Sequence, residues 1–145
     1  MDNIKYKILE NVAIADIAIE AYGKDVNELF ENAAFAIFEI SADLSTIERA
    51  QEKNIELEAD SLEDLLFDFL SEILYMKDTD SLIFHDVSVS VEEKDDQFEL
   101  QASFHGEQIN REKHALKADI KAITLHMFRI EETNDGYKAT VVVDV

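Results

Sequence analysis

The chain has 145 residues, 47% of them hydrophobic, and a formal net charge of −20 that comes from 33 acidic and 13 basic residues. This length allows one domain with a full core and is short for two domains of ordinary size. The acidic balance leaves no basic stripe to neutralise phosphates, so direct nucleic-acid binding is not expected. A metal ion, a basic protein surface or a cationic substrate is the favoured partner.

The composition also bounds the compartment and the chemistry. There is no cysteine, which excludes disulfides, thiolate metal sites and cysteine catalysis. The sequence shows neither a secretory signal nor a run of about 18 apolar residues, the length that a membrane span needs. We therefore expect a cytoplasmic protein with no membrane partner, folded as a single domain over residues 1–145. The sequence makes no prediction of its oligomeric state.

The N-terminal part of the chain predicts two strands and a helix. Lys5–Asn11 and Asp16–Tyr22 alternate as strands do. Asp25 stands three residues before Glu28, a spacing typical of a capping box, and predicts a helix start. The helix that follows has an apolar face at helical spacing. That face consists of Leu29, Phe30, Ala33, Ile37 and Ile40.

The rest of the chain predicts one more helix between strands and two hairpins. A polar segment of partly helical character separates the hairpins. These elements are the strand Lys53–Ala59, the helix from Ser61 to Asp78–Ser81, the hairpin of Val87–Val91 with Phe98–Phe104, the polar segment Gly106–Lys117, and the hairpin of Ala118–Glu132 with Tyr137–Val145. The fold class is therefore α+β, a mostly antiparallel sheet of about six or seven strands with two long helices packed on it.

The short catalytic signatures are missing. There is no P-loop, no G-x-G-x-x-G, no H-E-x-x-H, no G-x-S-x-G and no EF-hand loop. The four histidines, His85, His105, His114 and His126, show no ligand spacing and are interpreted as structural. We predict no catalytic residue.

Two aspartates differ from the other acidic residues. Asp16 follows Ala13-Ile14-Ala15, and Asp144 follows three valines and precedes the last residue, Val145. A carboxylate among apolar neighbours is costly to desolvate without a cation or donors. Two aspartates with the terminal carboxylate form an oxygen ligand set that suits Ca²⁺ or Mg²⁺. Strand-end aspartates exposed to water are the alternative, and spacing does not decide between the two.

Five segments match one set of family motifs in order. They are Asp16–Gly23, which resembles D-x-G-x-x-A-Y-G, Glu28–Ala34, which matches E-L-F-E-N-A-A, Leu65–Asp78, which resembles L-L-x-x-W-L-x-E-L-L-Y-x-x-D, Ile120–His126, which is similar to I-K-A-V-T-Y-H, and Val143–Val145, which resembles a terminal hydrophobic-Asp-hydrophobic. These motifs are those of the archease family. Together they cover nearly the whole chain.

The resemblance implies a protein cofactor that activates an RtcB-type tRNA-splicing ligase by promoting its guanylylation and multiple turnover. It implies a divalent metal, Ca²⁺ with Mg²⁺ as the alternative. The family's metal ligands correspond here to Asp16, Asp144 and the carboxylate of Val145. Lys121, Asp119 and His114 match further positions near the same cleft. The acidic charge fits an activator that meets a basic, RNA-binding enzyme surface.

The sequence departs from the family pattern in two places. The His and Thr that usually lead into the first aspartate are replaced by Ala13-Ile14-Ala15, in a stretch one residue longer than in close relatives. Leu125 replaces the usual aromatic residue before His126. Loss of the hydroxyl and the imidazole removes support for a metal-binding aspartate, so we expect weaker metal binding than in a relative with the full motif.

Two other functions remain as alternatives. One is a divalent-metal-dependent enzyme that processes phosphoesters, with Asp16 and Asp144 as ligands and Lys121 as a charge-stabilising group. The other is a non-catalytic calcium-binding scaffold domain.

Overall fold

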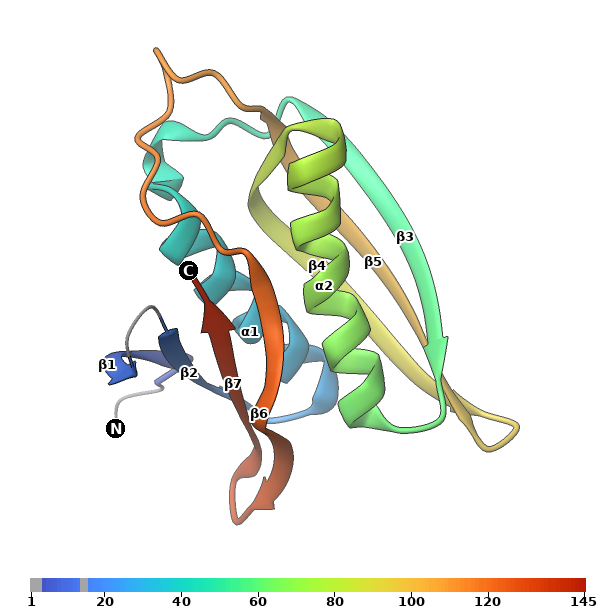
Figure 1. Cartoon of the computed structure of the whole chain (residues 1–145). Helices are drawn as coiled ribbons and strands as arrows, with labels where there is room; N and C mark the ends of the chain where they lie inside the picture. Colours follow the sequence, from blue (N-terminus) through green and yellow to red (C-terminus); the bar gives the residue numbers. More distant parts are fainter. Residues whose placement is uncertain (1–3, 14–15) are drawn as a thin grey trace.

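Two helices and two antiparallel sheets share one core in a computed structural model that describes residues 4–13 and 16–145 (Figure 1). Both helices contact both sheets. No described helix is long and apolar enough to cross a bilayer. The elements are β1 (Tyr6–Ala13), β2 (Asp16–Gly23), α1 (Val26–Ser41), a short 3₁₀ turn (Leu44–Thr46), β3 (Gln51–Ala59), α2 (Leu62–Asp80), β4 (Leu82–Lys94), β5 (Gln97–Gln108), β6 (Ala122–Thr133) and β7 (Gly136–Asp144).

The strands form one sheet in the order β1-β2-β7-β6 and another in the order β3-β5-β4. Every pairing between the described strands is antiparallel. The α+β class predicted from the sequence is confirmed. The sequence predicted one sheet, and it did not predict that the strands divide between two. The alternation of side chains along a strand does not indicate which other strand it pairs with.

Both helices begin at the predicted caps. The Asp25 side chain accepts a hydrogen bond from the Glu28 N–H at 2.8 Å, and the Ser61 hydroxyl accepts one from the Asp64 N–H at 3.1 Å. Each bond satisfies a backbone donor that the first helical turn leaves without a partner, which contributes about 1 kcal/mol to stability.

Three buried phenylalanines link the helices to the three-stranded sheet. Phe69 of α2 lies with its ring centroid 5.8 Å from that of Phe30 in α1 and 5.8 Å from that of Phe104 in β5. All three side chains are fully buried. Truncating one of them to alanine would cost about 3–5 kcal/mol, so this cluster fixes the spacing of the layers.

Helix side chains cap an edge of each sheet. In β4, the Val89 N–H donates to Glu31 Oε2 and the Val91 N–H to Asn27 Oδ1, both at 2.8 Å and both from α1. In β6, the Ile130 N–H donates to Glu63 Oε2 of α2 at 2.9 Å. These bonds satisfy edge donors that would otherwise face water or a second chain.

The segment before β6 differs from the prediction. β5 continues to Gln108, β6 begins only at Ala122, and the residues between them contain turns and no helix. The Lys117 N–H donates to Ser41 O at 2.9 Å and the Ala118 N–H to Ile40 O at 3.1 Å. The last carbonyls of α1 therefore hold this segment in place of a strand partner.

Candidate functional site

Asp16 and Asp144 lie directly opposite each other on adjacent strands. Asp16 begins β2, Asp144 ends β7, and the antiparallel register pairs them. Opposed residues in such a pair project to one side of the sheet, with Cβ atoms about 4.5–5.5 Å apart. The next pair along, Ile17 with Val143, belongs to the core, so the two aspartates project to the outer side. Both are partly exposed.

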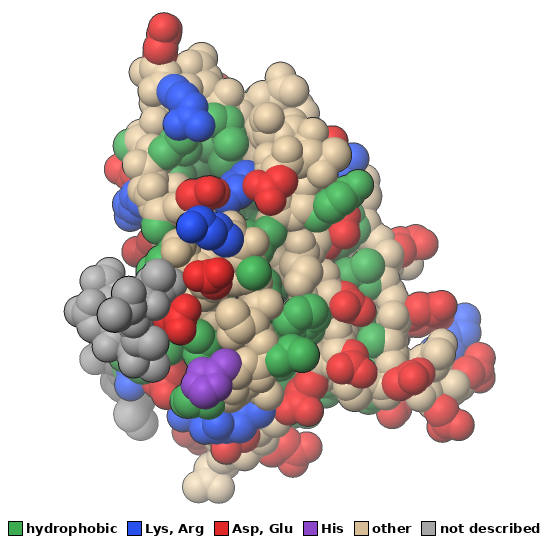
Figure 2. Space-filling view, in the orientation of Figure 1, with side chains coloured by type: hydrophobic (Ala, Val, Ile, Leu, Met, Phe, Trp, Pro, Cys, Tyr) green, Lys and Arg blue, Asp and Glu red, His purple; other side chains and the backbone are tan. Residues whose placement is uncertain are grey.

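Lys121 and Val145 lie at the same end of the sheet. Ala122 pairs with Asp144, and the Lys121 N–H donates to Asp144 O at 2.7 Å. The Val145 side chain packs against the core, which leaves its carboxylate beside Asp144 at the end of β7. Two side-chain carboxylates, a main-chain carboxylate and a lysine thus share one end of the four-stranded sheet. On the face drawn in Figure 2, acidic and basic side chains lie side by side near this end.

Asp119 forms an ion pair with α2. Its Oδ1 lies 2.5 Å from Nζ of Lys77, which also donates to Ile120 O at 3.4 Å. The Asp119 side chain is 77% exposed and that of Lys77 only 13%. The bond from Lys77, with the nearby charges of Lys121 and Arg111, holds the pKa of the Asp119 carboxyl below its usual range against the effect of burial. This aspartate therefore anchors the loop before β6 to α2.

His114 is buried and fully engaged within its loop. Its Nδ1 accepts from the Asn110 N–H at 2.9 Å, so the proton is on Nε2, which lies 2.7 Å from Glu107 Oε1. Glu107 also accepts from the Glu48 N–H and from Lys113. These donors, the Glu48 N–H foremost, lower the pKa of Glu107 to about 2. The geometry gives His114 a part in holding the loop and no free nitrogen for a ligand.

The chemistry of the Asp16 end fits a hard cation. Among the described residues, no three or more His, Asp or Glu side chains form a cluster able to hold a metal ion. A cation at this end would have the two opposed aspartates and the carboxylate of Val145 as protein ligands, with water for the remaining positions. An all-oxygen set of this kind suits Ca²⁺ or Mg²⁺ rather than Zn²⁺. The missing His and Thr correspond to residues 13 and 14, and residue 14 lies outside the described ones.

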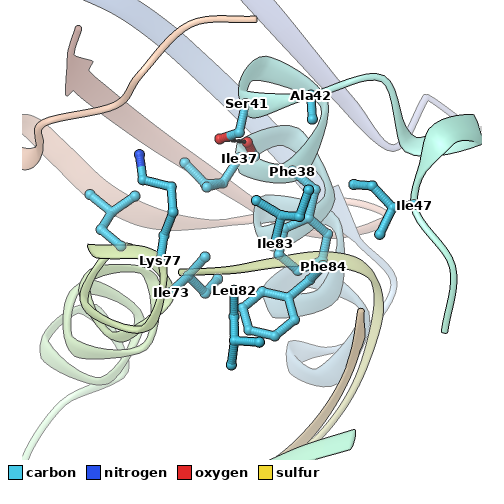
Figure 3. Close-up of a pocket in the computed structure, with 11 residues that line it drawn as sticks. Ile37, Phe38, Ser41, Ala42, Ile47, Ile73, Lys77, Leu82, Ile83 and Phe84 are labelled. Carbon is cyan, nitrogen blue, oxygen red and sulfur yellow. Dashed lines mark hydrogen bonds between the residues drawn. The ribbon is translucent and has the colours of Figure 1, made fainter. Parts of the chain in front are cut away.

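An apolar cavity of about 20 Å³ lies between α1, α2 and the start of β4 (Figure 3). Its walls include Phe38, Ile73 and Phe84, and the aliphatic stem of Lys77 forms part of its rim. The Ser41 hydroxyl at its edge is already bonded to Ile37 O. A space of this size holds about one water molecule, so it does not accommodate a nucleotide.

Sequence reasoning missed a polar cluster on the three-stranded sheet. Asp86 accepts from Arg49 Nε and His85 Nδ1, both at 2.7 Å, and lies 3.3 Å from His105 Nδ1. Burial opposes ionisation, but the bonds from His85 and Arg49 lower the pKa of the Asp86 carboxyl. The only sequence signal was the alternation of β5, which places His105 on its outer face. The pairing of Asp86 with His105 follows a register shift in β4 that alternation does not reveal.

Comparison with known proteins gives one consistent result. Residues 6–145 match the profile described as Archease protein family (MTH1598/TM1083). "Protein archease" of Pyrococcus furiosus is 41% identical over 90% of this chain and 93% of its own length, and that of Methanothermobacter thermautotrophicus 39% identical over the same shares.

Two solved structures share the fold. The solution structure of Methanobacterium thermoautotrophicum protein 1598 has a TM-score of 0.85 at 34% identity and covers 97% of this chain and 99% of its own. A Thermotoga maritima crystal structure described as an archease, possible chaperone, has a TM-score of 0.62 at 22% identity over 92% of this chain and 93% of its own.

Proposed function

The chain belongs to the archease family, and we propose that it is a protein cofactor that activates an RtcB-type tRNA-splicing ligase. It would promote guanylylation of the ligase and allow multiple turnover. It would carry out no reaction of its own, in keeping with the lack of catalytic signatures in the sequence.

The observation that carries this proposal is the register that sets Asp16 against Asp144. Like charges directly opposite on neighbouring strands destabilise a sheet unless a cation or strong donors lie between them. We propose that Asp16, Asp144 and the carboxylate of Val145 hold a divalent metal, Ca²⁺ or Mg²⁺. The ion would offset two of the three negative charges at this end of the sheet, and its remaining coordination positions, filled by water, could accept a phosphate or carboxylate oxygen of the ligase.

The surrounding residues supply binding and orientation. The net charge of −20 attracts a basic enzyme surface and raises the rate of encounter. The exposed Lys121 beside the carboxylates adds a cation that a phosphate can contact. Activation then requires only that this chain bind the guanylylated or product-releasing state of the ligase more tightly than the other states.

A guanylylation assay with the cognate ligase tests the proposal. The wild-type chain should increase the amount of ligase–GMP and the number of turnovers in the presence of GTP. If the ligase guanylylates equally well without the chain, the proposal is wrong. If the purified chain alone hydrolyses phosphoesters and Asp144→Asn abolishes that hydrolysis, the enzyme alternative replaces it.

A further inference from the structure

One edge of the strand β3 has no partner strand in the described part of the chain. The strand bonds to β5 along its other edge. Alternate residues of an edge strand direct their N–H and C=O groups away from the sheet. The edges of β4 and β6 are capped by side chains of α1 and α2. Over the described residues, no side chain or neighbouring backbone bonds to this edge of β3.

The outer face beside this edge is acidic. Two rows of side chains cross the three-stranded sheet, Glu56–Gln101–Ser90 and Glu58–Glu99–Glu92. Glu56 and Glu58 are exposed and belong to β3 itself. Figure 2 shows acidic side chains along the side of the molecule where Figure 1 places β3 and the β4–β5 hairpin. An added strand would meet a line of carboxylates on this face.

The opposite face of β3 is apolar at Ile55, Leu57 and Ala59, and the exposed Lys53 precedes them on that face. Ile55 and Leu57 are half-buried against the core and remain partly open at the edge. An added strand that alternates basic and apolar residues would therefore place cations beside Glu56 and Glu58, and apolar side chains beside Ile55 and Leu57.

We propose that the free edge of β3 binds an extended basic segment of a partner protein as a fourth strand of the sheet. Backbone hydrogen bonds would supply affinity, and the alternating side chains specificity. A second copy of the chain does not fit, because pairing β3 with β3 would bring glutamates of the two copies together. The proposal is independent of the ligase hypothesis, since it uses a different sheet from the one that holds Asp16.

The geometry limits which charges a bound strand would feel. Neighbouring strands lie about 4.8 Å apart, so an added strand would lie about 5 Å from β3 and about 14 Å from β4. The screening length at physiological salt is about 8 Å. Glu56 and Glu58 would therefore lie within one screening length of the segment and attract it, whereas Glu92 and Glu93 of β4 would be largely screened.

A synthetic peptide that alternates lysine with valine, blocked at both ends, tests the proposal. Binding to the full chain at physiological salt is followed by NMR, with amide exchange as a second readout. Alternate amides of β3 should become protected. A peptide with glutamate in place of lysine should not bind, and N-methylation of alternate peptide amides should abolish binding.

Charge reversal supplies the matched control. The variant Glu56→Lys with Glu58→Lys should weaken binding at least tenfold, since two pairs of about 0.7 kcal/mol are lost and like charges then face the peptide lysines. The variant Glu92→Lys with Glu93→Lys changes the net charge equally and should weaken binding about twofold at most. Equal losses in both variants, undiminished binding of the N-methylated peptide, or no binding at all would overturn the proposal.

Discussion

Facing carboxylates occur on both sheets, in different surroundings. On the four-stranded sheet, Asp16 faces Asp144, and the neighbours of Asp144 on the same side of β7, Val142 and Thr140, are buried. On the three-stranded sheet, Glu58 faces Glu99, which faces Glu92. There Gln101 and Ser90, the neighbours in the adjacent row, are exposed.

The difference indicates which of the two groups is suited to hold a cation. Glu58 and Glu92 are exposed and Glu99 between them is partly exposed, so water and salt screen the repulsion within the glutamate row and it needs no bound ion. The aspartate pair lies beside a dry surface and next to the terminal carboxylate, where repulsion is screened less. The same cross-strand arrangement is therefore a solvated surface on one sheet and a candidate ion site on the other.

The largest expected effect is on calcium affinity, which substitutions in the aspartate pair should lower and substitutions in the glutamate row should not. Asp16→Asn or Asp144→Asn removes one of three carboxylates and should weaken Ca²⁺ binding by about tenfold to a hundredfold, because ligand charge sets the affinity of oxygen sites. The matched change Glu58→Gln with Glu92→Gln should leave the affinity unchanged. Isothermal titration calorimetry measures the Ca²⁺ affinity of the wild type and the three variants. An equal loss of affinity in the glutamate variant would show that the aspartate pair is not a distinct ion site.

The next effect tests whether water is excluded from the buried part of β7 that lies on the same side as Asp144. Thr140 is 5% exposed, and its hydroxyl has no hydrogen-bond partner among the described residues. Replacing it with valine, which has nearly the same shape, should raise the free energy of unfolding by about 1 kcal/mol. Urea denaturation measures this change. A loss of stability would mean that the hydroxyl has a partner, and that this side is wetter than we infer.

A smaller effect is expected at the centre of the glutamate row. Glu99→Gln removes the charge that faces both Glu58 and Glu92 and should stabilise the protein by about 0.5 kcal/mol at low salt. The gain should shrink as salt is added, because the row is exposed. A gain that persists at high salt would show that the row is less well solvated than its exposure indicates.

The smallest effect is expected at Glu31 of α1, a partly buried carboxylate that belongs neither to the aspartate pair nor to the glutamate row. Burial, together with the charges of Asp25 and Glu28, raises the pKa of Glu31, although its bond from the Val89 N–H acts in the opposite direction. A raised folded pKa means that the neutral form favours folding, and that this stability is lost as the pH rises through the folded pKa.

Glu31→Gln keeps the acceptor oxygen for Val89 and removes the charge. It should be more stable than the wild type by about 0.3 kcal/mol at pH 7, the usual cost of one like-charge helical pair. The difference should vanish below the unfolded pKa of about 4.3. Thermal unfolding of both proteins at pH 7 and at a pH below about 4.3 measures the difference. A difference that grows in acid would mean that the charged form of Glu31 stabilises the fold, contrary to our prediction.

Much of the fold was predictable because its signals are local. Asp25 and Ser61 cap helices within three residues of their partners, and a turn between Thr133 and Gly136 joins β6 to β7, within the gap of the predicted hairpin. The segment before β6 was predicted less well. Its backbone is satisfied by Ser41 O and Ile40 O, which lie far back in the sequence.

The candidate site could be predicted only in part, because its geometry depends on residues far apart in the sequence. Asp16 and Asp144 were singled out from their apolar neighbours, but their facing register joins the two ends of the chain and has no spacing signal. The bond of Lys77 to Asp119 and the edge cap from Glu31 were hidden for the same reason. Lys77 and Glu31 lie on helices, where a single charged residue has the pattern of an ordinary solvated position.

The most direct test compares ligase guanylylation with the wild-type chain, Asp144→Asn and Glu99→Gln, after circular dichroism shows that all three are folded. We predict that Asp144→Asn loses most of the stimulation of ligase–GMP formation, while Glu99→Gln stimulates as well as the wild type. Full stimulation by Asp144→Asn would contradict the claim that the aspartate end of the four-stranded sheet acts on the ligase.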